Sequence, residues 1–151
     1  MFEKKLYASW GDMDFNSHMR NTAYLDKAGD VRMMFFSEHG FPMSEFARLK
    51  IGPIITKDEI EYFREVSLLD ELKVNLEIAG LSDDGSRWLM RNEFFCSDSK
   101  LAAKVTSVGG WLDLAARKPV PPPEKLLVAL RSLPRASDFQ KLDTRVRMTK
   151  R

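Results

Sequence analysis

The sequence predicts an α+β fold in which an antiparallel sheet packs on one long helix. Three observations lead to this prediction: an amphipathic segment at residues 22–38, at least four extended segments between residues 51 and 114, and short turns between those segments. Strands joined by short turns pair antiparallel, because a parallel crossover needs a dozen or more residues. The 151 residues suffice for one core, and 44% hydrophobic with 30% charged residues is typical of globular proteins.

The first elements are a short strand and the long helix. Residues 3–10 alternate apolar side chains with others and place Trp10 on the apolar face, which indicates a strand. In residues 22–38 apolar side chains recur at steps of three and four, as on one face of a helix. We expect Asn21 to cap the start of this helix and Gly40 to end it.

A shorter helix and a run of strands come next. Residues 44–49 are predicted to be helical, with Ser44 as the cap. Strands are predicted at residues 51–66, 71–80, 88–96 and 101–114. Asp83-Asp84-Gly85 is a turn signal that makes the second and third of these strands a hairpin. Gly109-Gly110 indicates a bulge or a close approach of two backbones.

The C-terminal part of the chain differs from the rest in composition. We assign residues 1–118 to one domain and residues 119–151 to a basic, proline-rich extension in which residues 124–133 form a short helix. From Arg117 onward ten Lys and Arg residues stand against three Asp and Glu residues, in a chain whose net charge is only +2. A solvated extension is the simpler interpretation, and docking to an acidic partner is the alternative.

Composition also limits the compartment and the class of partner. The single cysteine, Cys96, excludes an internal disulfide and a multi-cysteine zinc site. There is no signal-peptide pattern and no apolar run of the ~18 residues that span a membrane. We therefore expect a cytoplasmic protein with no integral membrane segment. Basic residues confined to the tail, with few interleaved aromatic residues, give no support for nucleic-acid binding.

A polar cluster lies between the first strand and the long helix. The stretch DMDFNSHMRN, residues 12–21, contains two carboxylates, two amides and a histidine. In an extended backbone Asp14, Asn16 and His18 would point the same way. The unpaired N–H groups of the first helical turn, with its positive dipole end, would lie close by. A carboxylate base beside N–H groups aimed at a carbonyl oxygen suits acyl transfer to water.

Three other interpretations of the cluster remain open at this point. Asp and Asn are common in turns and caps, so the loop can simply satisfy backbone groups. Asp12, Asp14 and His18 can also be interpreted as ligands of a divalent metal ion. Finally, His18 can be a structural histidine whose ring bonds a backbone carbonyl.

Two segments resemble a known family. From Asp14 to Tyr24 the chain shows the pattern D-x-N-x-H-x-x-N-x-x-Y, which resembles the signature of hotdog-fold thioesterases of the 4-hydroxybenzoyl-CoA thioesterase superfamily, especially the plant acyl-ACP (acyl carrier protein) thioesterases. Residues 10–14, WGDMD, are similar to the segment before the catalytic aspartate in bacterial acyl-CoA members. Residues 61–65, EYFRE, resemble the L-E-Y-R-R-E segment of the acyl-ACP enzymes. The resemblance covers about residues 3–115.

This resemblance implies a hotdog fold, an antiparallel sheet wrapped around one long helix, and hydrolysis of an acyl-CoA or acyl-ACP thioester. It implies that Asp14 activates water or attacks the thioester carbonyl. The implied catalytic residues are Asp14, Asn16, His18 and Glu65, and the implied substrate-binding residues are Asn21, Thr22, Ala23 and Tyr24. No metal and no cofactor other than the CoA of the substrate is implied.

The resemblance further implies a homodimer or homotetramer with its sites at subunit boundaries. Two-layer folds with one helix on an open sheet leave an edge and a face uncovered, which agrees with self-association. The alternative function is a non-catalytic acyl-binding or interaction protein that keeps the same scaffold, because a fold by itself does not define an activity.

Overall fold

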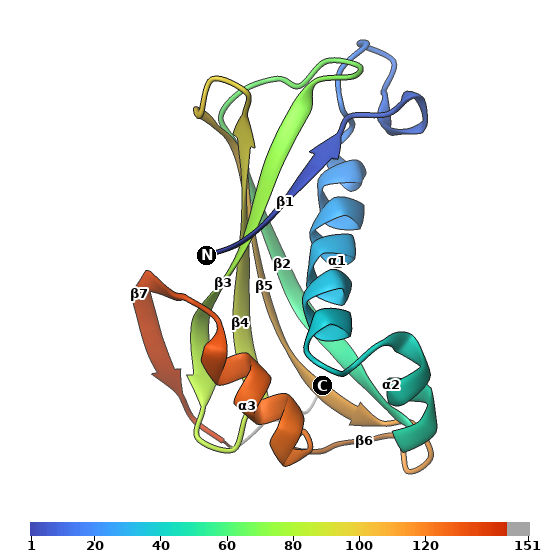
Figure 1. The fold of residues 1–151 in the computed structure, drawn as a ribbon, viewed down its shortest axis with the longest axis vertical. Coiled ribbons are helices and arrows are strands. Elements are labelled where there is room, and N and C mark those ends of the chain that lie inside the picture. Colours follow the sequence, from blue (N-terminus) through green and yellow to red (C-terminus); the bar gives the residue numbers. More distant parts are fainter. Residues whose placement is uncertain (145–151) are drawn as a thin grey trace, which may run out of the picture.

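A curved sheet wraps around one side of a long helix (Figure 1). The structure is a computed structural model and describes residues 1–144. The strands are β1 (Phe2–Tyr7), β2 (Ile51–Tyr62), β3 (Glu71–Ser82), β4 (Arg87–Cys96), β5 (Leu101–Asp113), β6 (Lys118–Pro119) and β7 (Arg135–Leu142). The helices are α1 (Asn21–Glu38), α2 (Met43–Leu49) and α3 (Glu124–Ser132), with a 3₁₀ turn, η1, at Trp10–Asp12. None of the helices in residues 1–144 is both long and apolar enough to cross a membrane.

The strand order across the sheet is β1-β3-β4-β5-β2. All neighbours in this order are antiparallel, and the predicted hairpin joins β3 to β4. β2 is therefore an edge strand, while β1 and β7 share the opposite edge along β3. The predicted α+β fold, an antiparallel sheet wrapped around one long helix, is confirmed.

The core lies between α1 and the concave face of the sheet. The predicted stripe of α1 is buried, with Tyr24, Ala28 and Phe35 each at most 2% exposed. Inward-facing residues of the central strands meet this stripe, and Phe94 packs edge-on against Tyr24 with ring centroids 5.3 Å apart. Because side chains alternate along a strand, every second residue of β4 from Trp88 to Phe94 is buried. Burial of this helical stripe fixes how α1 sits on the sheet.

The glycine pair in β5 confirms the expected close approach. A Cβ atom on Gly109 would lie 2.1 Å from the carbonyl oxygen of Ile54 and 2.5 Å from the Trp88 ring. Glycine at this position lets the indole of Trp88 lie directly on the backbone of β5, where its Nε1 donates to the carbonyl oxygen of Gly110 over 3.2 Å. The pairing of β2 with β5 shifts register between Ile55 and Lys57, beside this contact.

Three boundaries differ from the sequence-based expectation. Trp10 lies in η1 and is 82% exposed, because the strand ends at Tyr7. Arg20 occupies the N-cap position of α1 without a side-chain cap, so Asn21 is the first helical residue and not the cap. Pro42 likewise precedes α2 in place of the expected Ser44 cap. A proline needs no partner for a backbone N–H and has φ fixed near the helical value, which suits a helix start.

The C-terminal residues up to 142 pack on the domain, so the interpretation of a solvated extension is wrong for this part of the chain. The helix expected at residues 124–133 is α3, and its Leu126 and Leu130 are fully buried in the same core as α1. β7 was not expected from the sequence, and it pairs in parallel with the end of β3. Its residues show little alternation, so the strand signal was weak. Residues 145–151 of the predicted extension lie outside the described residues.

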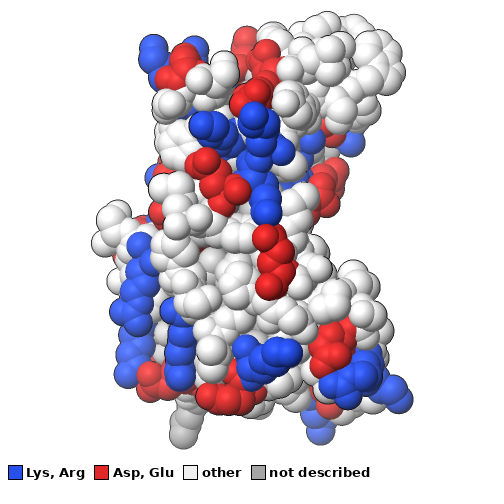
Figure 2. Space-filling model, viewed as in Figure 1, with Lys and Arg blue, Asp and Glu red and all other residues white. Residues whose placement is uncertain are grey.

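Charged side chains of both signs are mixed over the face shown in Figure 2. This face shows no continuous basic surface of the kind that binds a nucleic-acid backbone. The part of the molecule where the loop after β1 projects is largely uncharged. In this loop Phe15 is fully exposed and Trp10 is mostly exposed.

We predict opposite effects on stability from two glycine substitutions. Gly109→Ala should lower the free energy of unfolding by about 3 kcal/mol, because the new methyl group meets backbone that cannot move aside. Gly29→Ala should raise it by up to about 1 kcal/mol, because alanine favours the helix and nothing lies within 4 Å of the new Cβ. Urea unfolding of both variants beside the wild type measures the two changes, and a stable Gly109→Ala protein would contradict the packing described.

Candidate active site

The loop between β1 and α1 is a tight hairpin and not the extended segment that we expected. A bridge pairs Met13 with Met19, and the backbone N–H of Asp14 donates to the carbonyl oxygen of His18 over 2.8 Å. Ser17 has a φ of 63°, which turns the chain back on itself. The polar side chains of the cluster are therefore brought together by a turn, and the alternation argument was wrong.

The carboxylate of Asp14 holds this turn in shape. Its Oδ1 accepts the backbone N–H groups of Asn16 over 2.8 Å and of His18 over 3.2 Å. One oxygen of Asp14 thus satisfies backbone groups of the turn, as the polar-turn interpretation predicts. The other oxygen, Oδ2, has no hydrogen-bond partner within residues 1–144. One oxygen fixes the orientation of the carboxylate, and the second is left free for chemistry.

Glu65 joins the cluster from the segment that follows β2. This segment docks against the loop, with the backbone N–H of Met19 donating to the carbonyl oxygen of Val66 over 2.7 Å. As a result, Nε2 of His18 lies 3.2 Å from Oε2 of Glu65. The ring of His18 thus faces Glu65. A carboxylate beside one ring nitrogen holds the imidazole in place and favours a proton on that nitrogen.

The cluster forms one side of a groove of about 570 Å³ at the start of α1. Its lining residues are Asp14, Asn16, His18, Met19, Asn21, Tyr24, Tyr62, Phe63, Arg64 and Glu65. Six of the eight residues proposed from the sequence are therefore brought together. The other two do not line the groove: Oγ1 of Thr22 accepts a hydrogen bond from Arg20, and Ala23 is fully buried with its N–H on the carbonyl oxygen of Arg20.

Four lining residues were not singled out from the sequence: Met19, Tyr62, Phe63 and Arg64. Three of them lie in the EYFRE segment, so its resemblance already pointed to this part of the chain. Tyr62 packs edge-on against Tyr24, with ring centroids 5.3 Å apart, and Arg64 bonds Asp98 over 2.8 Å. Phe63, at 51% exposed, leaves an aromatic surface open at the rim.

The hydroxyl of Tyr24 is a hydrogen-bond donor in the groove that stays protonated at physiological pH. Burial, with smaller contributions from neighbouring groups that include Tyr62 and Asp14, raises the pKa of the Tyr24 hydroxyl to about 12. The hydroxyl therefore keeps its proton throughout the physiological pH range. A neutral donor on the helix side of the groove can bond a carbonyl oxygen without carrying charge itself.

An ion pair anchors the loop to α1. Nζ of Lys27 lies 2.9 Å from Oδ2 of Asp12 and also donates to the carbonyl oxygen of Tyr7 over 3.0 Å. The same Asp12 oxygen accepts the N–H and the hydroxyl of Ser9. Burial by itself raises the pKa of Asp12, but these hydrogen bonds outweigh it and lower the pKa to about 2. Asp12 thus stays ionised and holds the base of the hairpin.

The metal-site alternative is not supported by this arrangement. The carboxylate of Asp12 bonds Lys27 and does not join Asp14 and His18. In the part of the chain that the structure describes, no three His, Cys, Asp or Glu side chains are grouped to hold a metal ion.

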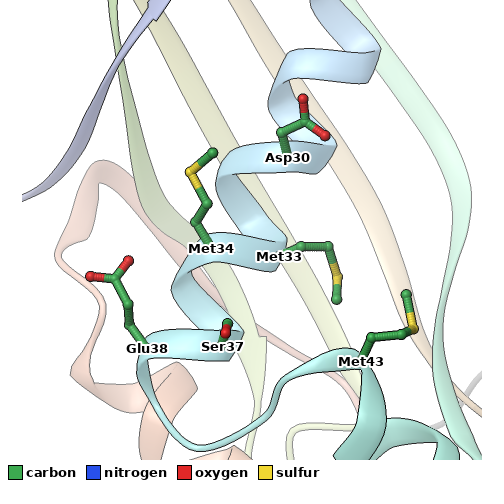
Figure 3. A pocket seen from close by; sticks show the side chains of 6 residues that line it. All are labelled: Asp30, Met33, Met34, Ser37, Glu38 and Met43. Atoms are coloured by element: carbon green, nitrogen blue, oxygen red, sulfur yellow. The ribbon is translucent and has the colours of Figure 1, made fainter.

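A second hollow, of about 500 Å³, lies on the outer face of α1 (Figure 3). Its lining residues are Asp30, Met33, Met34, Ser37, Glu38 and Met43. The side chains of Met33 and Met43 extend to the same side of α1. The two carboxylates of this hollow have no histidine or amide beside them in its lining, so it lacks the groups that the first groove combines.

The fold and the groove define a protein of the hotdog class. A profile of the thioesterase-like superfamily matches residues 8–130, so the chain belongs to that superfamily. The resemblance found in the sequence is thereby confirmed. The comparison with curated proteins gave no match.

Solved structures with the same fold include three informative ones. A hypothetical protein from Staphylococcus aureus, in complex with CoA, is 22% identical with a TM-score of 0.78, over 88% of this chain and 85% of that chain. A 1,4-dihydroxy-2-naphthoyl-CoA thioesterase from Synechocystis is 18% identical with a TM-score of 0.78, over 87% of this chain and 96% of that chain. A gentisyl-coenzyme A thioesterase is 20% identical with a TM-score of 0.75, over 85% of this chain and 98% of that chain. At these identities the likeness shows the fold.

We predict that Asp12→Asn destabilises the protein in a pH-dependent way. The variant should lose about 2 kcal/mol of unfolding free energy at neutral pH, because the charge-assisted bonds of the carboxylate are lost. The carboxyl of the unfolded chain takes up a proton near the ordinary pKa of 3.8, whereas the folded carboxyl does so only near its pKa of about 2. The wild-type advantage is therefore complete above pH 4 and shrinks as the pH falls toward 2.

Denaturant unfolding at a series of pH values measures this difference. Asp26→Asn is the matched control, because that carboxylate is 69% exposed and its ion pair with Arg20 is long, at 4.0 Å. Its loss should therefore change stability little. A difference between wild type and Asp12→Asn that stays constant from pH 6 to pH 2.5 would contradict the assignment of the anchor.

Proposed function

We propose that this protein hydrolyses acyl thioesters, with acyl-CoA as the substrate and Asp14 as the residue that acts on the thioester carbonyl. The observation that supports the proposal is the free Oδ2 of Asp14, held in a groove that also contains an amide, a histidine and the first residue of α1. Hydrolysis needs a base or nucleophile on one side of the carbonyl carbon and donors at its oxygen.

The donors come from the start of α1. Asn21 is the first helical residue, and the N–H groups of the first helical turn have no acceptor within the helix. The N–H of Ala23 is already bonded to Arg20 and Thr22 does not line the groove, so the backbone donor of the proposed site is the N–H of Asn21. The positive end of the helix dipole favours the negative charge that develops on the oxygen. The hydroxyl of Tyr24 supplies a further neutral donor.

Asp14 acts in one of two ways in this proposal. Its free oxygen takes a proton from water that attacks the carbonyl carbon, or it attacks that carbon itself to form an anhydride that water then opens. The side-chain amide of Asn16 lies in the same groove and orients the water. Glu65 holds His18, and the imidazole can return a proton to the departing thiolate. These steps use no metal ion and no redox cofactor.

Acyl-CoA is the preferred carrier in the proposal for two reasons. The superfamily assignment implies thioester chemistry, and two of the similar structures are named as CoA thioesterases while a third contains CoA. An acyl carrier protein as the carrier and a location in the cytoplasm stay predictions from the sequence. A non-catalytic acyl-binding protein is the alternative, but binding alone does not need Asp14, Asn16 and His18 in one groove.

We also propose that the protein works as a dimer or a tetramer of dimers. β2 is a twelve-residue edge strand, and most of its residues are exposed. Such an edge is a template for a second strand. The groove lies at the end of β2, at Tyr62 and the residues after it, so a second copy paired along this edge would help to enclose the site. The exposed Phe63 at the rim is available for that contact.

We predict that Asp14→Asn lowers turnover of acyl-CoA by about 10²–10⁴-fold, because the amide cannot act as base or nucleophile. Thiol release from short, long and aromatic acyl-CoAs, followed with a thiol-reactive dye, measures the rates. Asp30→Asn is the matched control, because it makes the same change on the outer face of α1 (Figure 3) and should keep the wild-type rate. An Asp14→Asn rate within a few-fold of the wild type would refute the role of Asp14.

The proposed oligomer predicts a solution mass of at least twice that of the monomer at micromolar concentration. Light scattering coupled to size exclusion gives this mass directly. A single species with the mass of one chain would show that β2 stays unpaired and that the site functions, if at all, within one subunit.

A further inference from the structure

An apolar surface is exposed at the end of the molecule where the loops after β1 and β2 lie (Figure 1). We call it the apolar tip, and its side chains, each at least 40% exposed, are Tyr7, Trp10, Phe15, Leu68 and Leu69. Backbone bonds join the two loops, because the N–H of Leu69 donates to the carbonyl oxygen of Ala8 over 2.7 Å and a bridge pairs His18 with Ser67. The tip is therefore built from two segments that lie side by side.

The tip is larger than the single exposed apolar residues that are common on protein surfaces. One aromatic side chain can cover about 150–250 Å², and the tip has Phe15 fully exposed and Trp10 mostly exposed. With Leu69 they reach the size of the largest apolar patches of ordinary monomers, about 300–600 Å², which often mark interaction sites. Leu69 also has a φ of 67°, a backbone conformation that suits glycine or asparagine better than leucine. Folding alone therefore does not account for these side chains.

Both loops are held in shape by their own hydrogen bonds. Asp12 bonds Lys27 at the base of the first loop, and Oδ1 of Asp14 accepts backbone N–H groups of its own turn. In the second loop, Oδ2 of Asp70 accepts the backbone N–H of Ser67 over 2.8 Å. Because these bonds order the backbone in advance, insertion of the apolar side chains into another phase costs little conformational entropy.

The charges of the two loops favour a neutral lipid surface as the occupant. Residues 8–19 and 65–70 contain no Lys or Arg but four acidic residues. Anionic membranes and nucleic acids are attracted by basic residues, so neither gains from these loops. Tryptophan and tyrosine are enriched where a bilayer meets water, because their rings are apolar and carry one polar group. Zwitterionic phospholipid therefore suits the tip in both charge and residue type.

A second copy of the chain suits the tip less well. Tyr7 ends β1, which pairs with β3 at the edge of the sheet opposite β2. Pairing of two copies along β2 would therefore leave Trp10 and Leu69, which lie beside the end of β1, exposed to water. Side chains that project from loops also need a matching hollow in a protein partner, whereas the boundary between headgroups and acyl chains adapts to them.

We propose that the apolar tip docks this protein on zwitterionic phospholipid bilayers, with Trp10, Phe15 and Leu69 inserted at the level of the headgroups. The groove opens at the same end of the molecule, since Asp14 and His18 belong to the hairpin that carries Phe15. Docking itself does not depend on the proposed function. The substrate class does rest on that function: it is an acyl-CoA with a long aliphatic chain, which dissolves in the bilayer and enters the groove from it.

Trp10 is a built-in reporter of docking. The chain has three tryptophans, and Trp88 and Trp111 are at most 2% exposed, so a change of environment at the surface acts on Trp10. The test mixes the full chain with vesicles of phosphatidylcholine, with and without bromine on the acyl chains. We expect the emission of Trp10 to shift to shorter wavelength on binding and to be quenched by the brominated lipid. Added phosphatidylserine should not strengthen the binding, because the loops of the tip carry no basic residue.

Two variants locate the docking surface and keep Trp10 as the reporter. Phe15→Asn and Leu69→Asn should each lower the partition constant for vesicles by about 10-fold or more, because each removes a large apolar side chain from the bilayer. Asparagine tolerates the positive φ at position 69. Val128→Asn is the matched control and should bind as the wild type does, because Val128 is an exposed apolar residue on α3, far from the tip (Figure 1).

Four results would overturn the inference. The first is an unchanged emission of Trp10 at millimolar phosphatidylcholine, and the second is binding that requires phosphatidylserine. The third is wild-type binding by both tip variants. The fourth is a Trp10 that is already shielded from acrylamide in the absence of vesicles, which would assign the tip to a contact with protein.

Hydrolysis rates separate this inference from the proposed function. The tip variants should match the wild type with acetyl-CoA in solution, and they should be slower with palmitoyl-CoA in vesicles by a factor similar to their loss of binding. Docking without hydrolysis of any thioester supports the tip and refutes the proposed function. Hydrolysis without docking overturns the inference and leaves the proposed function intact. Equal rates of variants and wild type with palmitoyl-CoA in vesicles would overturn the substrate class.

Discussion

The whole arrangement depends on α1 being held against the concave face of a curved sheet. Burial of Tyr24, Ala28 and Phe35 fixes the rotation of the helix, and the close contact of Trp88 with Gly109 fixes the strands below it. Once the helix cannot rotate or slide, its first turn has one position relative to the end of β2. The groove is therefore a consequence of core packing, and its polar residues lie where two rigid elements end.

The loop that carries Asp14 adds a second level of order. Its base is tied to α1 by Asp12 and Lys27, and its tip is shaped by the carboxylate of Asp14. Asp14 therefore has a structural and a proposed chemical role through different oxygens. This division explains why the polar-turn interpretation and the catalytic interpretation of the same residues are compatible. Only one of the two oxygens is needed to hold the turn.

Much of the fold could be predicted from the sequence, and the reason lies in its periodic segments. The long stripe of α1 and the alternation in β3 and β4 are repeated over many residues, so single exceptions do not hide them. β7 was missed because its pairing with β3 is a tertiary contact with little local pattern. The cluster residues were found from their chemistry, but the hairpin geometry was not, because it depends on the positive φ of Ser17.

The two edges of the sheet differ in a way that limits how far it can grow. One edge is divided between β1 and β7, two short strands that run in opposite directions along β3. No single long strand can add there in one orientation. The other edge, β2, is long, and two copies that meet through it use up this edge on both sides. In the proposed dimer, growth by strand addition would therefore stop at two chains, so the same pairing that encloses the site would also resist fibre formation.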